Sequence, residues 1–204
     1  MLDLINLVRN FPNKKVMVIG DLMLDRYLFG EVSRISPEAP IQILNAKYRK
    51  YAPGGAANCA VNLSTLGAKN SIYGIIGADS NGRKLCILLK KYNINTQGIQ
   101  ISKKCKTIVK ERIVSNNQQL LRIDFENVSS YRECSKEKII QKIKKDIKKY
   151  DSILVSDYAK GLINKELIET IKNTRKPNTP IIVDPKPINK DLFKDVTLVK
   201  PNLK

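Results

Sequence analysis

A chain of 204 residues with 42% apolar and 27% charged residues is long enough, and apolar enough, to form one sizeable α/β domain with a real core, so disorder is excluded. The absence of histidine excludes Ser-His-Asp and Cys-His catalysis and any histidine-ligated metal. The balance of 37 Lys and Arg against 19 Asp and Glu gives a net charge of +18, a value found in nucleic-acid-binding proteins.

The N-terminal segment and the cysteines indicate a protein of the cytoplasm. Asp3 and Arg9 interrupt the first apolar stretch, which therefore lacks the pattern of a signal peptide. No apolar run approaches the ~18 residues that cross a bilayer, so we expect no membrane partner. The cysteines are scattered, form no CxxC motif and are expected to be reduced and mostly buried: Cys59, Cys86, Cys105 and Cys134.

Short apolar runs alternate with helical patterns along the chain. Strands are expected at 14–21, 70–77, 151–157, 179–184 and 196–202. Helices are expected at 56–66, 80–92, 135–150 and 164–174, the last with Asn164 as its N-cap. This order predicts an α/β fold with a mostly parallel sheet that helices cover on both faces.

Two strand-rich excursions, at about 27–49 and 107–125, interrupt this order. Apolar and polar residues alternate in both, and "SNNQ" at 115–118 separates two β-runs in the second. We expect them to form a small antiparallel sheet inserted beside the main one, within a single domain that covers residues 1–204.

We attribute the net positive charge to lysines on solvent-exposed faces. In the helix expected at 135–150, Ile139, Ile143 and Ile147 recur at helical spacing, which leaves the lysines on the opposite, exposed face. A nucleic-acid partner is therefore not expected, although the charge would attract anionic substrates.

Acidic residues follow three of the expected strands. Asp21, Asp157 and Asp184 each stand where a strand ends, and Asp25 lies one turn beyond Asp21. The carboxyl ends of parallel strands form the ligand crevice, although any one of these residues is as well explained as a helix cap or an Asx-turn. Together they favour a ligand that is rich in hydroxyl groups or bound through a metal.

The pair Gly54-Gly55 stands directly before an expected helix, with Asn58 in its first turn. Glycine permits close approach of a ligand to the backbone, and the helix start offers free N–H groups. By itself the pair is better explained as a turn, and the chain contains neither a Walker A nor a GxGxxG motif.

The spacing of the glycines along this stretch is a more specific signal than the Gly54-Gly55 pair alone. "GGAANCA", then six residues and Gly67, then nine residues and Gly77, resembles the N-terminal signature of the ribokinase-like (PfkB) carbohydrate kinases. Further segments are similar to the bacterial D-glycero-β-D-manno-heptose-7-phosphate kinases, in family order from about Val16 to Lys204: "GDLMLDRYLFGEVSRISPEAP", "QQLLRIDFE", "VSDYAKG", "VDPK" and "PNLK".

The resemblance implies a ribokinase-like fold and an activity. The activity is ATP-dependent, Mg²⁺-assisted phosphorylation of the anomeric hydroxyl of the heptose 7-phosphate to the 1,7-bisphosphate, in ADP-heptose and lipopolysaccharide core synthesis. It also implies a β lid over the sugar that forms a homodimer contact. Arg26, Arg34, Arg112 and Lys160 are all available to hold the 7-phosphate.

Carried over by resemblance, one set of residues would bind the sugar: Asp25, Gly54, Gly55, Asn58, Asp157 and Lys160. A second set would contact the nucleotide: Lys186, Asn202, Leu203 and Lys204. Asp184 is a weak candidate for a metal contact.

The family's catalytic GxGD motif is absent, and no catalytic residue is assigned within the chain; the base aspartate is expected beyond Lys204. Removal of a general base costs ~10²–10⁴ in rate, so this chain alone is expected to be almost inactive. The alternatives are a non-catalytic sugar-phosphate-binding fragment and a PfkB kinase of another sugar.

Overall fold

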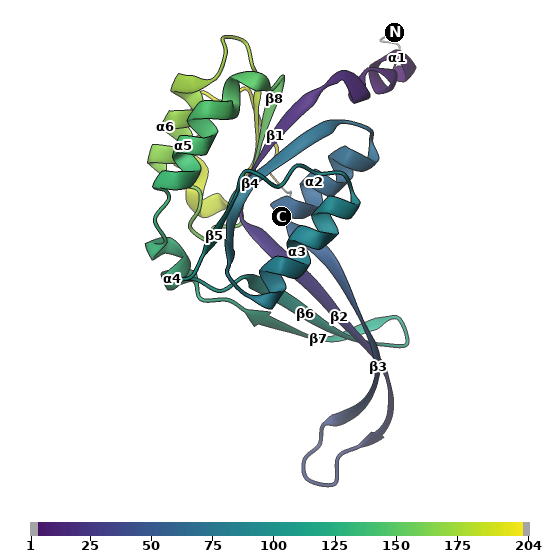
Figure 1. The fold of residues 1–204 in the computed structure, drawn as a ribbon. Helices are drawn as coiled ribbons and strands as arrows, with labels where there is room; N and C mark the ends of the chain where they lie inside the picture. Colours follow the sequence, from purple (N-terminus) through teal and green to yellow (C-terminus); the bar gives the residue numbers. More distant parts are fainter. Residues whose placement is uncertain (1–3, 202–204) are drawn as a thin grey trace.

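The computed structural model describes residues 4–201, and a parallel six-stranded sheet forms its centre (Figure 1). The strand order is β10-β9-β8-β1-β4-β5, and every neighbouring pair is parallel. The strands are β1 (Lys15–Gly20), β4 (Lys69–Gly77), β5 (Ile99–Ser102), β8 (Ser152–Ser156), β9 (Ile181–Asp184) and β10 (Leu198–Val199). The strands expected from the apolar runs are thus confirmed, with β5 as an addition.

Helices cover both faces of this sheet (Figure 1). On one face lie α2 (Ala56–Thr65) and α3 (Ser80–Lys91), and on the other α5 (Glu137–Asp146) and α6 (Lys165–Thr174). The remaining helical elements are short: α1 (Leu4–Arg9), α4 (Val128–Glu133), η1 (Phe11–Asn13), η2 (Ile147–Lys149) and η3 (Pro187–Phe193). Each helical layer packs its apolar side on the sheet, so the core is divided into two clusters. The four predicted helices are confirmed, and Asn164 caps α6 by accepting a hydrogen bond from Leu167 N at 2.9 Å.

A second sheet, which we call the lid sheet, has the order β3-β2-β6-β7. Its strands are β2 (Leu22–Ile35), β3 (Gln42–Gly55), β6 (Ile108–Ser115) and β7 (Gln118–Phe125). The antiparallel pairing expected of the lid is present within each hairpin, β2–β3 and β6–β7, and the two hairpins are joined by a parallel pairing of β2 with β6 that was not expected. The reason is that β2 continues β1 after Asp21 and β6 follows β5, and β1 and β5 point the same way in the main sheet.

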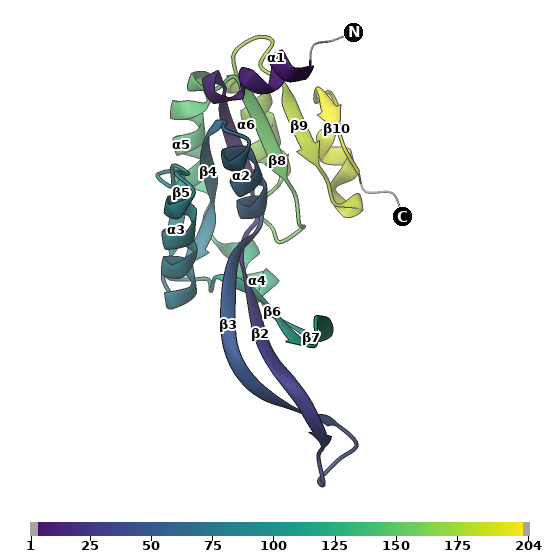
Figure 2. The same ribbon diagram turned by 90° about the vertical axis from the view of Figure 1, so that its right-hand side faces the viewer.

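The lid strands extend beyond the layered body (Figure 2). The β2–β3 hairpin is the longer arm, and the β6–β7 hairpin lies beside its base (Figure 2). Asn116 and Asn117, with φ of 48° and 62°, form the predicted turn between β6 and β7. Asparagine tolerates this left-handed conformation better than most residues, and two such residues match the twist of a hairpin.

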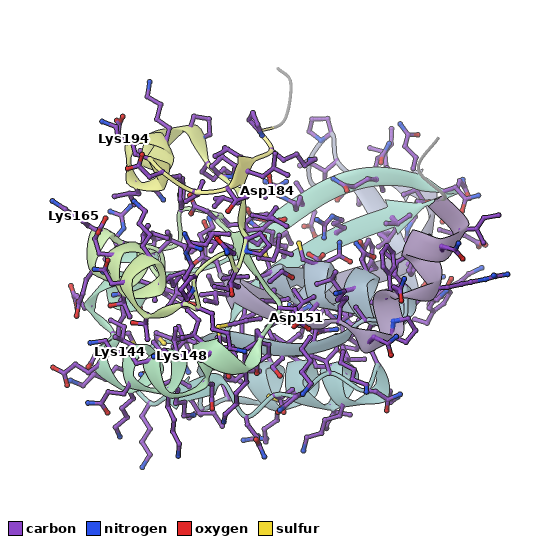
Figure 3. All side chains as sticks on the ribbon, turned by 90° about the horizontal axis from the view of Figure 1, so that it is seen from above. Lys144, Lys148, Asp151, Lys165, Asp184 and Lys194 are labelled. Atoms are coloured by element: carbon purple, nitrogen blue, oxygen red, sulfur yellow. The ribbon has the colours of Figure 1, made fainter. Side chains whose placement is uncertain are left out.

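The lysine-rich face of α5 and η2 is exposed, as the spacing of the isoleucines predicts. Ile139 and Ile143 are completely buried, whereas Lys144 and Lys148 lie on the outside (Figure 3). Among the described residues, no helix is long and apolar enough to span a bilayer.

Candidate active site

A cavity of about 410 Å³ lies between the lid sheet and the carboxyl ends of the parallel strands. The ends of β1, β8 and β9 are neighbours, with Gly20 beside Ser156 and Ser156 beside Asp184. The lining residues come from the lid sheet, from α2 and from the loops that follow β8 and β9: Met23, Asp25, Gly55, Asn58, Lys110, Arg112, Arg122, Asp124, Tyr158, Lys160 and Lys186. The site is therefore strongly polar and assembled from distant parts of the chain.

Two features set the position of Asp25 in the cavity wall: an ion pair, and the space beside it that a glycine leaves free. Its Oδ1 accepts a hydrogen bond from Arg112 Nη1 at 2.8 Å. A Cβ atom on Gly54 would lie 2.8 Å from the Asp25 carboxyl group, closer than a normal contact. Gly54 thus leaves the space that this carboxylate occupies, although it does not itself line the cavity.

Gly55 turns the chain from β3 into α2. Its φ of 59° and ψ of −135° belong to a conformation that glycine adopts without strain. No side chain caps the start of α2, and Ala56 N is bonded to Asp21 O. Asn58, in the first turn, is exposed to the cavity, so its amide is available to sugar hydroxyls.

The lid supplies most of the cations. Lys110 Nζ lies 2.7 Å from Asp124 Oδ2, and Arg122 Nε lies 2.9 Å from Asp124 Oδ1. The hydrogen bond from Lys110 is the main reason why the pKa of Asp124 is below its usual range. Lys160, from the loop after β8, pairs with Glu126 at 2.7 Å. These ion pairs arrange positive charge along one wall of the cavity.

Asp21 supports the loop that follows β8, outside the cavity lining. It is completely buried, and its carboxylate accepts backbone hydrogen bonds from Tyr158, Lys160 and Leu162 at 3.0, 3.1 and 3.3 Å. Burial raises the pKa of Asp21, and the three backbone N–H groups oppose this shift. The carboxylate thereby fixes the loop that carries Lys160 into the cavity.

Asp157 joins two loops rather than facing the cavity. Its oxygens accept hydrogen bonds from Ala159 N at 2.8 Å, from Lys186 N at 3.1 Å and from Asn189 Nδ2 at 2.9 Å. It is 3% exposed and does not line the cavity, so the sugar-binding role assigned to it by resemblance stays a prediction. The backbone of Lys186 is fixed by this bond, and its ammonium group lies 5.7 Å from the ring centroid of Tyr158.

The structure brings together part of the set of residues singled out in the sequence. Five of them line the cavity: Asp25, Gly55, Asn58, Lys160 and Lys186. Asp184 ends β9 outside the lining, and the described residues contain no group of three or more His, Cys, Asp or Glu side chains that could hold a metal. Asn202, Leu203 and Lys204 lie outside the described residues.

Other lining residues were not singled out as site residues: Met23, Lys110, Arg122, Asp124 and Tyr158. Arg112 had been noted only among the available cations. The alternation within 107–125 contains a usable signal, because Lys110 and Arg112, and likewise Arg122 and Asp124, must share a face of their strands. The parallel pairing of β6 with β2, which places Lys110 beside Asp25, could not be read from either segment.

Comparison with known proteins agrees with this geometry. The model of the pfkB family of carbohydrate kinases matches residues 13–204. The protein named Bifunctional protein HldE of Sulfurimonas denitrificans is 40% identical over 191 residues, and that of Aliarcobacter butzleri is 41% identical over 194 residues. These alignments cover 93% and 95% of this chain, and the chain spans 40% of the length of either relative.

Solved structures have the same fold at low identity. A putative ribokinase from Agrobacterium tumefaciens is 18% identical with a TM-score of 0.68, covering 92% of this chain and 59% of that one. Arabidopsis thaliana ribokinase complexed with ribose and ATP is 17% identical with a TM-score of 0.69, covering 93% and 60%. The expected ribokinase-like fold is confirmed. The chain belongs to the pfkB family of carbohydrate kinases.

Proposed function

We propose that this chain is the sugar-binding part of an ATP-dependent kinase that phosphorylates the anomeric hydroxyl of D-glycero-β-D-manno-heptose 7-phosphate. The product would be the 1,7-bisphosphate, used for ADP-heptose and lipopolysaccharide core synthesis in the cytoplasm. The proposal is supported by the motifs shared with heptose-7-phosphate kinases and by the identity of about 40% to HldE proteins over nearly the whole chain.

The charge of the cavity lining supports a phosphorylated sugar as the substrate. Five lining residues are cations, against two carboxylates, Asp25 and Asp124. A neutral sugar needs carboxylate and amide groups for its hydroxyls, which Asp25 and Asn58 supply. The additional cations suit a phosphate group, which guanidinium groups bind in bidentate fashion. Of the four cations available to the 7-phosphate, Arg112 and Lys160 line the cavity, whereas Arg26 and Arg34 do not.

The nucleotide would lie beside Lys186, which reaches the cavity from the loop after β9. Asn202, Leu203 and Lys204 are proposed to continue that contact. Mg²⁺ would neutralise charge on the ATP phosphates; because no carboxylate cluster is present in the described part of the chain, its ligands would come mainly from the nucleotide, with Asp184 nearby. The chain's own residues would bind and orient the sugar, and the base would come from a GxGD aspartate beyond Lys204.

The test is an ADP-release assay on the product of the whole reading frame that contains this chain. Heptose 7-phosphate, the unphosphorylated heptose, ribose and fructose are compared at equal concentration. We expect turnover that is at least tenfold faster with heptose 7-phosphate. Faster turnover of ribose or fructose would favour a pfkB kinase of another sugar. Binding of heptose 7-phosphate by calorimetry without ADP release would favour a non-catalytic sugar-phosphate-binding protein.

We further propose that the protein forms a homodimer through the lid. Tyr27, Phe29 and Tyr48 stack along the β2–β3 arm, with ring centroids 6.2 and 4.9 Å apart. Farther along the same arm, Ile35 and Ile41 are 69% and 60% exposed. Apolar surface of this kind is typical of an interface. Sedimentation equilibrium of the wild type and of Ile35→Asp tests this: we expect a dimer and a monomer, and a monomeric wild type would contradict it.

A further inference from the structure

Two thiols are in contact at the base of the lid. Cys105 lies in the loop between β5 and β6, and Cys134 stands at the end of α4. Their Sγ atoms are 3.3 Å apart, and Cys134 Sγ is 2.9 Å from Ser102 Oγ. We propose that Cys105 and Cys134 are a redox pair whose oxidation to a disulfide fixes the base of the β6–β7 hairpin.

The geometry requires little movement. A disulfide has an S–S length of about 2.05 Å, so the sulfur atoms need to approach by only about 1.2 Å from their 3.3 Å separation. Both cysteines are free, and they are 5% and 3% exposed. Cys59 and Cys86 are more accessible and lie on α2 and α3, on the other face of the sheet, so they serve as internal controls.

The position gives the bond a consequence for the cavity. Cys105 and Cys134 are 29 positions apart, and the segment between them contains the whole β6–β7 hairpin. That hairpin carries four cavity residues: Lys110, Arg112, Arg122 and Asp124. A bond between the two ends of the segment closes it into a ring and removes conformations in which the hairpin separates from the body. Oxidation thus restrains the cation-rich wall of the cavity.

The reaction needs an oxidant, and a low-molecular-weight disulfide such as oxidised glutathione is sufficient. One protein thiolate attacks a sulfur of that disulfide, which releases one glutathione thiolate and leaves a mixed disulfide. The second protein thiolate attacks the protein-bound sulfur, forms the Cys105–Cys134 bond and releases the second glutathione. Two protons leave the protein thiols, and the two electrons are taken by the oxidised glutathione.

Burial controls the rate of this reaction. Burial, and then the hydrogen bond with Cys134, raise the pKa of Cys105 to about 11. Since the thiolate is the nucleophile, the pair reacts slowly near neutral pH and faster at higher pH.

The chemical test uses the reduced protein and excess oxidised glutathione at pH 8. We expect a disulfide-linked peptide that contains Cys105 and Cys134, formed with the loss of two hydrogen atoms and with glutathione on neither residue, and any glutathione adduct only at Cys59 and Cys86. The Cys59→Ser/Cys86→Ser variant is expected to behave in the same way, whereas Cys134→Ser forms no such bond. Glutathione adducts at Cys59 and Cys86 without a Cys105–Cys134 bond would overturn the proposal.

The second measurement tests the effect on the lid. Hydrogen exchange of the amides at 108–125 is expected to be at least ~10-fold slower in the oxidised than in the reduced protein. Cys134→Ser treated with the same oxidant is expected to show no change. If Cys134→Ser does not fold, Cys105→Ala replaces it as the control. A disulfide that leaves exchange at 108–125 unchanged would refute its action on the lid.

Discussion

The carboxylate of Asp25 and the guanidinium of Arg112 form a 2.8 Å ion pair across the parallel junction of β2 and β6. This pair joins the two chain excursions that build the lid sheet. Burial acts to lower the pKa of Arg112, but the hydrogen bond and charge of Asp25 outweigh it and raise that pKa. Arg112 therefore stays charged, and it keeps the Asp25 carboxylate oriented toward the cavity.

Loss of this guanidinium should weaken binding of the sugar phosphate. A hydrogen bond to a charged group contributes about 1.5–3 kcal/mol, so we expect Arg112→Ala to raise the Kd for heptose 7-phosphate by roughly 10–100-fold. Isothermal titration calorimetry measures the Kd of the variant and of the wild type. Arg34→Ala is the matched control, since Arg34 is exposed on β2 and does not line the cavity, and its Kd should be unchanged. Equal Kd values for the two variants would remove Arg112 from the site.

A methyl group at position 54 should displace Asp25. Because the Cβ of Gly54→Ala would lie 2.8 Å from the Asp25 carboxyl group, that group must move, and we expect affinity for the sugar to fall by at least tenfold. Gly67→Ala is the control: with a φ of +92° it is strained and should cost ~1 kcal/mol of stability, but it lies away from the cavity. If Gly54→Ala binds the sugar with the wild-type affinity, the space that Gly54 leaves beside Asp25 has no role in sugar binding.

Removal of the buried Asp21 carboxylate should destabilise the fold. Asp21→Ala leaves the N–H groups of Tyr158, Lys160 and Leu162 without their acceptor. A buried unsatisfied donor costs about 1–3 kcal/mol, so we expect a loss of at least ~3 kcal/mol in urea unfolding. Asp21→Asn keeps one acceptor oxygen and should lose less. A change below ~0.5 kcal/mol for Asp21→Ala would show that this carboxylate does not support the loop.

The stability supplied by Asp79 should depend on pH. Its carboxylate caps α3 by accepting from Gly82 N, and it also accepts from Thr107 N, each at 2.8 Å. Burial acts to raise the pKa of Asp79, but these hydrogen bonds outweigh it, and the folded-state pKa is lower than the usual value of 3.8. The stabilisation is therefore complete well above pH 3.8 and is lost as the pH falls through the folded-state pKa.

The corresponding experiment compares two helix caps. Asp79→Ala should cost about 1–2 kcal/mol at pH 7, and the difference from the wild type should shrink as the pH is lowered toward 3. Asn164→Ala removes a cap of α6 that does not titrate, so its cost should stay the same over this range. Urea unfolding at several pH values measures both. A cost for Asp79→Ala that does not change with pH would contradict the assigned pKa direction.

Local patterns were sufficient for the layered body and for part of the site. Apolar runs and helical periodicity predicted the parallel strands and the four main helices, because burial of an apolar face decides each of them locally. The short strand β5 and helix α4 were missed, since with four and six residues they have almost no periodicity. Gly55 and Asn58 were singled out because they belong to the compact motif "GGAANCA", and Asp25 because it lies in the separate family segment "GDLMLDRYLFGEVSRISPEAP".

The sequence by itself thus determined the order of strands and helices, the turn at Asn116 and Asn117, and the family motif. Only the tertiary structure decided that β2 and β6 pair in parallel, that Asp21 and Asp157 support loops, and that Cys105 contacts Cys134. The physical reason is the range of the interactions. Propensity and periodicity act within a few residues, whereas strand pairing and burial of a carboxylate or thiol depend on segments that meet only in the folded chain.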